Sequence, residues 1–287
     1  MKNVGYYNGK VGLIEEMTVP MNDRGMYFGD GVYDATYAAN RRIFELDAHV
    51  ERFFNGCAAL SMPFELSREA LKAELQRCVA LTDSSGEVQL YWQCTRGTAL
   101  RNHLFPRDGK PANLLITVRE LPLVKLTGKV KVLLQEDTRY LHCNIKTLNL
   151  IPNVMASQRA SEAGCQEAIF HRGDRVTECA HSNVHILKDG VFRTAPTDRL
   201  ILPGITRGHL LRVCNRLGVP TVEEPFQVEE LFTADEVILS SAGTLGVGVC
   251  EVDGRPVGGR DEGLLRKLQE QMAEDFYRET GYRPSIL

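Results

Sequence analysis

The sequence predicts an α+β protein built in two parts, and three observations support that class. The chain has 287 residues, which is enough for one large domain or two ordinary ones. Strand-like and helix-like periodicities both occur, and they are mixed along the chain rather than alternating regularly. A stretch with Pro122 and Gly128 resembles a linker. We therefore expect a small α+β domain over residues 1–120, a linker over 121–128 and a larger domain over 129–287.

The N-terminal part is expected to open with two hairpins. Asn8-Gly9 is a turn dipeptide that accepts positive φ, and it lies between two short strand-like segments. A second hairpin is expected to turn near Asn40. Residues 87–95 and 113–121 are rich in apolar, branched and aromatic side chains, which favours two further, buried strands.

Two helices are expected between these strands. Asp47 can cap a helix whose apolar residues recur at helical spacing until Pro63 stops it. A second helix is expected from Ser67, with an inner face made of Leu71, Leu75, Cys78 and Val79.

The C-terminal part should combine antiparallel strands with four helical segments. An alternating strand over 129–137 leads to a helix that Gly164 ends, and strands over 167–172, 175–179 and 183–196 follow. A helix from Ile205 toward Gly218, a short helical turn and a buried strand over 236–241 come next. A hairpin at Asp253-Gly254 precedes an amphipathic helix bearing Leu264, Leu265, Leu268, Met272 and Phe276.

Composition and charge indicate a globular protein that acts on small molecules. The formal net charge is −3, and no stripe of lysine and arginine suggests a nucleic-acid surface. No run of 18 apolar residues occurs, so we expect no membrane partner and a cytoplasmic location. The eight cysteines are scattered without a C-x-x-C pair, which favours free thiols. We expect no metal site, since His181 and His185 lack an acidic or cysteine ligand at useful spacing.

Lys146 is the first candidate for chemistry. It lies in C-N-I-K-T-L-N-L-I, among apolar and uncharged neighbours, between a predicted strand and the start of a predicted helix. Burial there favours the neutral amine, and a neutral amine can attack a carbonyl group. Most lysines are solvated surface charges, so a chemical role for Lys146 needs support from other residues.

Two glycine-containing turns could hold one phosphate group. L-P-G-I-T-R places Gly204, Ile205 and Thr206 at a helix start, where free amides and the helix dipole favour an anion. A strand also opens into S-A-G-T-L-G-V-G over residues 241–248. F-G-D-G-V-Y is not a dinucleotide-binding motif, because Asp34 occupies the place of the third glycine and a strand follows.

An amine and a phosphate site together suggest pyridoxal 5′-phosphate, whose aldehyde binds a lysine and whose phosphate needs an anchor. Such a site also needs a carboxylate at the ring nitrogen. Glu178 is the candidate, as the one acidic residue of R-V-T-E-C; an exposed strand glutamate is the alternative interpretation. Arg101 and His103, in T-R-G-T-A-L-R-N-H-L-F-P, also look positioned, although a solvated basic loop would read the same way.

These residues resemble a known family. F-G-D-G-V-Y, the arginine of H-V-E-R-F, the lysine of I-K-T-L-N, and V-T-E followed by S-N-V resemble the fold type IV aminotransferases, in order and spacing, over nearly the whole chain. The Arg101-x-His103 loop resembles that of D-amino-acid aminotransferases, where it grips the substrate α-carboxylate. The resemblance implies a small N-terminal α/β sandwich domain, a larger C-terminal pseudo-barrel domain, a cofactor in the cleft between them, and a homodimer.

The resemblance also implies residue roles. Lys146 would bind the cofactor aldehyde and then move the proton at the substrate Cα, and Glu178 would pair with the ring nitrogen. The phosphate would be held by Arg52, by backbone donors at Ile205 and Thr206, and by the turn at Ser241 and Ala242. Tyr33 would lie near the substrate, while Tyr91, Arg101 and His103 would receive its carboxylate, with the loop pair reaching across the dimer interface.

The sequence departs from the family pattern in two places. Cys179-Ala180-His181 follows Glu178 where a glycine and serines are expected, which removes hydroxyls and adds an imidazole. Ala242 stands in a turn that usually offers a hydroxyl, which predicts weaker cofactor retention by about 1.5 to 3 kcal/mol.

The resemblance implies a pyridoxal-phosphate-dependent transaminase that converts D-alanine and 2-oxoglutarate to pyruvate and D-glutamate. Its partners would be D-amino acids and 2-oxo acids. Three alternatives stay open: a branched-chain L-amino-acid aminotransferase, an aminodeoxychorismate lyase, and a catalytically silent binding protein.

Overall fold

The computed structural model describes residues 1–107 and 111–284. The chain forms two compact units. Unit 1 comprises residues 1–122, 145–149 and 278–282, and unit 2 comprises the remainder. The short segment 145–149, which includes Lys146, belongs to unit 1 although the residues on both sides of it belong to unit 2.

Unit 1 contains a six-stranded sheet in the order β2-β1-β6-β5-β3-β4, in which every neighbouring pair is antiparallel. The strands are β1 (Asn3–Tyr7), β2 (Lys10–Gly12), β3 (Gly31–Ala39), β4 (Arg42–Ile43), β5 (Val88–Thr95) and β6 (Asn113–Glu120). Both predicted hairpins are confirmed. Asn8, Gly9 and Asn40 adopt positive φ at their turns.

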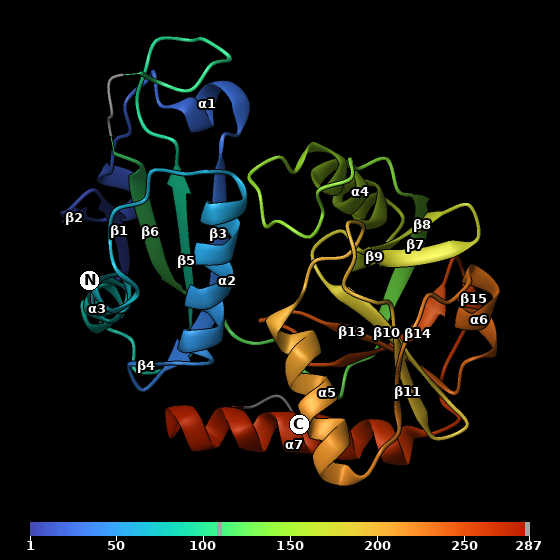
Figure 1. Ribbon diagram of the computed structural model, residues 1–287. Helices are drawn as coiled ribbons and strands as arrows, with labels where there is room; N and C mark the ends of the chain where they lie inside the picture. The colour runs from blue at the N-terminus through green and yellow to red at the C-terminus, as the bar shows by residue number, and fades with distance from the viewer. Residues whose placement is uncertain (108–110, 285–287) are drawn as a thin grey trace. The chain divides into compact units, whose positions relative to one another are not determined.

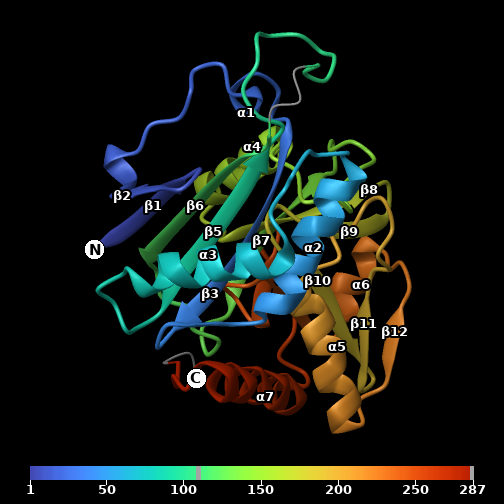
Figure 2. The same ribbon diagram turned by 60° about the vertical axis from the view of Figure 1, so that its left-hand side comes forward.

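The described residues of this unit also form η1 (Ile14–Glu16), a 3₁₀ turn, and the helices α1 (Arg24–Phe28), α2 (Leu46–Ala59) and α3 (Arg68–Ala80). Helix α2 packs on β3 and α3 packs on β6, so the two helices lie together on one face of the sheet (Figures 1 and 2). The core between them includes Val50, Phe53, Leu71, Leu75 and Trp92.

The prediction for the start of α3 is confirmed, whereas that for α2 is wrong. The Ser67 hydroxyl accepts a hydrogen bond from the Ala70 amide and caps α3. Helix α2 already begins at Leu46, and its cap residue is Glu45 in the left-handed conformation, with no side-chain cap. Asp47 is therefore the second helical residue, where its charge still complements the helix dipole.

Unit 2 contains a nine-stranded sheet in the order β12-β11-β10-β13-β14-β7-β8-β9, with β15 paired to β14. The strands are β7 (Val130–Glu136), β8 (Glu167–Arg172), β9 (Arg175–Cys179), β10 (Asn183–Lys188), β11 (Val191–Thr194), β12 (Thr221–Glu223), β13 (Glu236–Ser240), β14 (Val247–Val252) and β15 (Arg255–Pro256). The sheet curls into a half-barrel, seen in Figure 1. The ends of β9 and β10, which carry Glu178 and Asn183, lie close together as a result.

The helices of unit 2 are α4 (Ile151–Glu162), α5 (Ile205–Leu217), α6 (Val228–Thr233) and most of α7 (Glu262–Thr280). Gly164 and Gly218 adopt positive φ just beyond α4 and α5 and end both helices as predicted. In the part of the chain that the structure describes, no helix is both long enough and apolar enough to span a bilayer.

His185 is a fully buried histidine at the centre of the curled sheet. Its ring nitrogens lie 2.8 Å from Thr194 Oγ1 and 2.7 Å from Ser240 Oγ. Burial, helped by the charge of Arg207, lowers the pKa of His185 from 6.5 to about 3. The unfolded chain therefore takes up this proton first as the pH falls, so the stabilisation is complete above pH 6.5 and is lost toward pH 3.

We expect His185→Gln to remove part of the acid sensitivity of the fold. At about 1.36 kcal/mol per pH unit below 6.5, His185 should account for about 2 kcal/mol of the stability lost between pH 7.5 and pH 5. Urea denaturation of both proteins at the two pH values measures this difference. An equal loss in wild type and variant would contradict the assignment.

Candidate active site

Lys146 is held against strand β3 by a short run of backbone bonds within unit 1. The Lys146 carbonyl accepts from the Tyr33 amide at 3.0 Å, and the Leu148 amide donates to the Gly31 carbonyl at 3.1 Å. Val32 and Thr147 form an isolated antiparallel bridge between these two contacts. The lysine is thus fixed like a residue of an extra strand, although no regular strand includes it.

The glycines of F-G-D-G-V-Y make this approach possible. Gly29 ends α1 in the left-handed conformation, and its carbonyl accepts from the Asn149 side chain at 2.9 Å. A Cβ atom at Gly31 would lie 2.4 Å from the Cys94 carbonyl oxygen and 2.7 Å from the Leu148 side chain. The motif therefore brings the lysine segment close to β3, and it is not a nucleotide-binding turn.

Gly31→Ala should destabilise unit 1 by about 1–3 kcal/mol, because the clash at Cys94 is with backbone and cannot be relieved by a rotamer change. Gly86→Ala is the matched control, since its nearest new contact would be the Ser84 hydroxyl at 3.6 Å. Thermal or urea denaturation of the two variants checks this. Equal stability of both variants would show that the approach at Gly31 is not tight.

The side chain of Lys146 is half-buried and faces an aromatic ring. Its Nζ atom lies 4.3 Å from the centre of the Tyr33 ring. Tyr33 in turn lies 5.5 Å from Tyr91, whose hydroxyl donates to Gln93 at 2.6 Å. Burial raises the pKa of Tyr91 above its usual range, so this phenol stays neutral. Tyr33 thus lies beside the amine, and Tyr91 packs against Tyr33.

Arg52 is oriented by a buried carboxylate that the sequence did not reveal. Its Nε and Nη2 donate to the two oxygens of Asp34 at 2.8 and 2.6 Å, and the Nδ1 of His49 lies 2.8 Å from the same carboxylate. Burial alone would raise the pKa of Asp34, but the charge of Arg52, helped by the hydrogen bond from His49, outweighs it and holds that pKa far below its usual value. Asp34 is thus an ionised anchor for Arg52.

His49 adds no positive charge to this group. Burial lowers its pKa; Asp34 offsets part of that effect, while the cations Arg52 and Lys146 reinforce it. A neutral imidazole therefore fits beside the Arg52–Asp34 pair. The net result is a local excess of positive charge from Arg52 and Lys146 in unit 1, which suits an anionic ligand.

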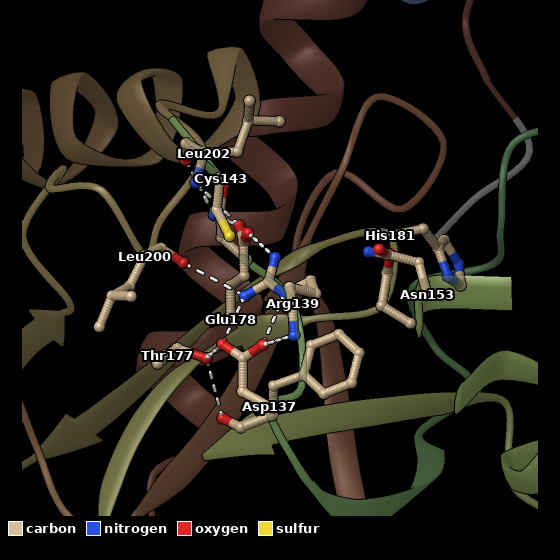
Figure 3. A network of polar contacts seen from close by, with 12 residues as sticks. Asp137, Arg139, Cys143, Asn153, Thr177, Glu178, His181, Leu200 and Leu202 are labelled. Carbon is tan, nitrogen blue, oxygen red and sulfur yellow. Dashed lines mark hydrogen bonds and ion pairs between the residues drawn. The ribbon is translucent and has the colours of Figure 1, made fainter. Parts of the chain in front are cut away.

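In unit 2, Glu178 is buried, so the exposed-strand alternative is wrong. One carboxylate oxygen is in close contact with Arg139 Nη1, and the other accepts from the Asn183 side chain and the Leu202 amide at 3.0 Å each. Figure 3 shows this network. Three donors around a buried carboxylate favour its ionised form.

Arg139 is itself fixed by a second carboxylate. Asp137 accepts from Arg139 Nε and Nη2 at 2.9 Å each, and from the Thr177 hydroxyl at 3.0 Å. The guanidinium also lies 4.7 Å from the centre of the Phe170 ring. Burial opposes the charge of Arg139, but Asp137 and Glu178 outweigh it and raise the pKa of Arg139 further. Glu178 therefore stands opposite a permanent, rigid cation (Figure 3).

The same network reaches the start of helix α5. Asn183 donates to the Leu202 carbonyl at 3.1 Å, and a Cβ atom at Gly204 would overlap the Asn183 side chain at 2.0 Å. Ile205 and Thr206 follow as the first residues of α5, whose amides have no acceptor within the helix. The structure thus ties a buried carboxylate and a helix N-terminus into one rigid piece.

The second predicted phosphate turn is closed on itself. The Ser241 amide donates to the Thr244 hydroxyl at 2.8 Å, and the Thr244 amide donates to the Ser241 carbonyl at 3.2 Å. The Ser241 amide is therefore already engaged, and the Ala242 methyl group brings no donor. The Ser241 hydroxyl also lies 3.1 Å from the Thr244 hydroxyl, and the Leu245 amide donates to the Ser241 carbonyl at 3.1 Å, so this turn has few donors left for an anion.

The unusual residues after Glu178 form a tight turn. The Cys179 amide donates to the Ser182 carbonyl at 2.8 Å. Glu167, a buried carboxylate, accepts from the Ser182 hydroxyl at 2.8 Å and lies 2.8 Å from Nδ1 of His181, whose side chain is 60% exposed. The added imidazole is thus held to one side by Glu167.

The predicted carboxylate loop lies at the end of unit 1 near helix α1. Arg101 and His103 are both exposed, and both contact the Phe28 ring, at 5.3 Å from its centre in each case. The alternative of a solvated basic loop explains why Arg101 and His103 are exposed. It does not explain why both contact the same aromatic ring. Two cationic or polar groups on one aromatic ring are suited to receive a carboxylate.

Comparison with known proteins identifies the family. The model of the amino-transferase class IV family matches residues 31–252. The chain belongs to this family. A curated D-alanine aminotransferase of Staphylococcus aureus (strain COL) is 38% identical over 273 residues, covering 94% of this chain and 95% of that protein. One of Listeria monocytogenes serotype 4b is 37% identical over 273 residues, covering 93% and 94%.

Solved structures show the fold of the class IV aminotransferases in this chain. The branched-chain amino acid aminotransferase from Escherichia coli superposes with a TM-score of 0.87 at 20% identity, covering 99% of this chain and 97% of that one. The branched-chain aminotransferase from Thermoproteus uzoniensis gives a TM-score of 0.86 at 22% identity, covering 97% and 96%. The predicted α+β fold type IV architecture is thereby confirmed.

Several residues of this class IV aminotransferase were not predicted. Asp34 was noted only for interrupting a glycine motif, although His49 and Arg52, three apart on α2, already pointed to one partner. Arg139 and Asp137 share a short segment without any periodicity that would have singled them out. Within the described residues, no group of three histidines, cysteines or acidic residues could hold a metal ion.

Proposed function

We propose that this class IV aminotransferase transfers the amino group of D-amino acids, D-alanine among them, to 2-oxoglutarate with pyridoxal 5′-phosphate as cofactor. The proposal rests chiefly on 36–38% identity to D-alanine aminotransferases over more than nine-tenths of the chain. The Arg101-x-His103 loop, set on Phe28, supports it with a group suited to an α-carboxylate.

The residues present fit the proposed cofactor by their chemistry. A half-buried lysine suits the aldehyde, and a buried ionised carboxylate suits the ring nitrogen. An arginine and the first amides of α5 suit the phosphate. When bound, pyridoxal phosphate supplies the aldehyde that links to an amine and a ring that accepts the electrons released at Cα.

Each protein group then has a separate task. Lys146 Nζ takes the proton from the substrate Cα and later returns one. Glu178, kept ionised by Arg139, holds the ring nitrogen in its protonated form. Arg52, oriented by Asp34, and the amides of Ile205 and Thr206 hold the phosphate, with the Ser241–Ala242 turn in a lesser role.

Substrate orientation belongs to the tyrosines and the loop. Tyr33 and Tyr91 line the side of the lysine amine, and Tyr91, Arg101 and His103 receive the carboxylate. The face of Cα that meets Lys146 depends on where the carboxylate is held, so a clamp on one side selects the D enantiomer.

We also propose a homodimer and a cytoplasmic location. Met26, Leu100, Leu104 and Phe105 are large apolar side chains that lie exposed on α1 and on the Arg101-x-His103 loop, as expected of a surface that meets a second copy. All eight cysteines are free thiols, which suits a reducing compartment. Light scattering of the purified protein tests the dimer.

Three parallel assays test the function. The protein is mixed with D-alanine and 2-oxoglutarate, with L-leucine and 2-oxoglutarate, and with an aminated chorismate derivative without an acceptor. Pyruvate and D-glutamate should form in the first mixture alone. Activity on L-leucine only would favour the branched-chain alternative, and pyruvate in the third mixture would favour the lyase.

A further inference from the structure

A buried arginine in unit 1 is bonded to the backbone of the Arg101-x-His103 loop. Arg24, in α1, has a side chain only 4% exposed. Its Nη1 donates to the Asn102 carbonyl at 2.6 Å and to the Leu104 carbonyl at 3.2 Å. Asn102 lies between Arg101 and His103, and Leu104 follows His103. One guanidinium thus grips the backbone on both sides of His103.

Arg24 is held in place by a carboxylate and a second arginine. Asp30 accepts from Arg24 Nε at 2.7 Å and from Arg96 Nε at 2.9 Å. Arg96 also donates to the carbonyls of Leu60 and Ser61 at 2.8 Å each, and its side chain is 5% exposed. Burying two guanidinium groups on one carboxylate is costly unless their remaining donors are satisfied. Backbone carbonyls satisfy several of them here.

The same group also positions the loop side chains. Arg24 lies 4.9 Å from the centre of the Phe28 ring, the ring that Arg101 and His103 also contact. Arg96 lies 3.7 Å from the centre of the Phe105 ring, at the far side of the loop. The loop has no regular strand or helix between residues 99 and 107. Within this stretch the Leu104 amide donates to the Asn102 side chain at 3.0 Å, so the loop is held by this local bond and by the contacts of Arg24 and Arg96 rather than by a backbone ladder.

We propose that Arg24 is a positioning residue that fixes the Arg101-x-His103 loop, and that Asp30 and Arg96 fix Arg24. This inference rests on the proposed function, in which the loop receives the substrate carboxylate. Because Arg24 acts on the backbone between and after the two clamp residues, it sets where their side chains stand. A displacement of about 1 Å at such a group can cost about 10²-fold in rate.

The inference predicts a selective effect of Arg24→Ala on substrate binding. The KM for D-alanine should rise about 10-fold or more, while kcat changes less than about threefold, because the amine and the cofactor groups are untouched. Arg24→Lys, which keeps the positive charge and one donor nitrogen, should recover part of the loss. Arg68→Ala is the matched control: Arg68 is an exposed arginine of unit 1 that contacts the Phe54 ring and pairs with Glu51.

A double-mutant cycle separates positioning from general stability. The two clamp residues count as one change in this cycle: if Arg24 acts through the loop, adding Arg24→Ala to a protein that carries both Arg101→Ala and His103→Ala should leave the KM unchanged within about twofold. Effects that multiply instead would overturn the inference. Should Arg24→Ala fail to fold, Arg24→Lys and Asp30→Asn take its place in the cycle. Each should then leave the KM unchanged when the clamp residues are already removed.

Trypsin provides a test that needs no substrate. Cleavage after Arg101, identified by mass spectrometry, should be several-fold faster in Arg24→Ala than in wild type or Arg68→Ala. An unchanged cleavage rate in folded Arg24→Ala would overturn the inference whatever the enzyme does. An unchanged KM in Arg101→Ala would instead refute the proposed carboxylate role of the loop, and faster cleavage would still support the contact between Arg24 and the loop.

Discussion

Replacing Lys146 with alanine should lower kcat for D-alanine transamination by about 10⁴-fold or more. The reason is that one amine both binds the cofactor and moves the proton at Cα, so no other group can take over either task. The backbone contacts of residues 146 and 148 with β3 do not involve the lysine side chain, so the fold should be kept. Steady-state kinetics with saturating pyridoxal phosphate measures the effect.

Lys131→Ala is the control for this variant. Lys131 is an exposed lysine that pairs with Glu251 at 3.0 Å, and its loss should leave kcat within about twofold. A Lys146→Ala protein that retained a tenth of wild-type activity would rule out Lys146 as the proton carrier.

Glu178→Gln should lower kcat by about 10²–10³-fold, since a neutral amide cannot hold the ring nitrogen in its protonated form. The free energy of unfolding should fall by about 1–3 kcal/mol. The amide oxygen can accept either from Arg139 or from Asn183 and Leu202, which leaves the amide nitrogen facing a donor on the other side. Kinetics and urea denaturation of the same preparation measure the two effects separately.

Glu236→Gln is the matched control for a buried carboxylate. Glu236 is fully buried in β13 of the same unit and lies 3.5 Å from Lys129. The free energy of unfolding of Glu236→Gln should fall about as much as that of Glu178→Gln, whereas its kcat should stay at the wild-type value. If both variants lost activity in proportion to stability, Glu178 would be a structural residue only.

Local signals predicted the regular elements well. Asn8-Gly9 and Asp253-Gly254 form the expected turns with positive φ, and Ser67 caps α3. Turns and helix caps depend on a few neighbouring residues, so they can be predicted from the sequence alone. The start of α2 was misplaced because Glu45 adopts a left-handed conformation, which a glutamate seldom favours, and its amide bonds to Glu279 at 2.9 Å.

The partners of the functional residues were harder to predict. Arg52 and Glu178 were singled out by their motifs, but Asp34 and Arg139, which orient them, are 18 and 39 residues away in sequence. Charged residues are common on surfaces, so nothing local marks the few that are buried in pairs. Arg24 was missed for the same reason, since its partners at 102 and 104 are backbone carbonyls.

We propose that Lys146 carries the cofactor. Reduction of the holoenzyme with borohydride fixes pyridoxal phosphate to the lysine that binds it, and peptide mapping then identifies that lysine. One labelled peptide is expected, with the modification on Lys146 of N-I-K-T-L. A label on any other lysine, or none in a protein loaded with pyridoxal phosphate, would contradict it.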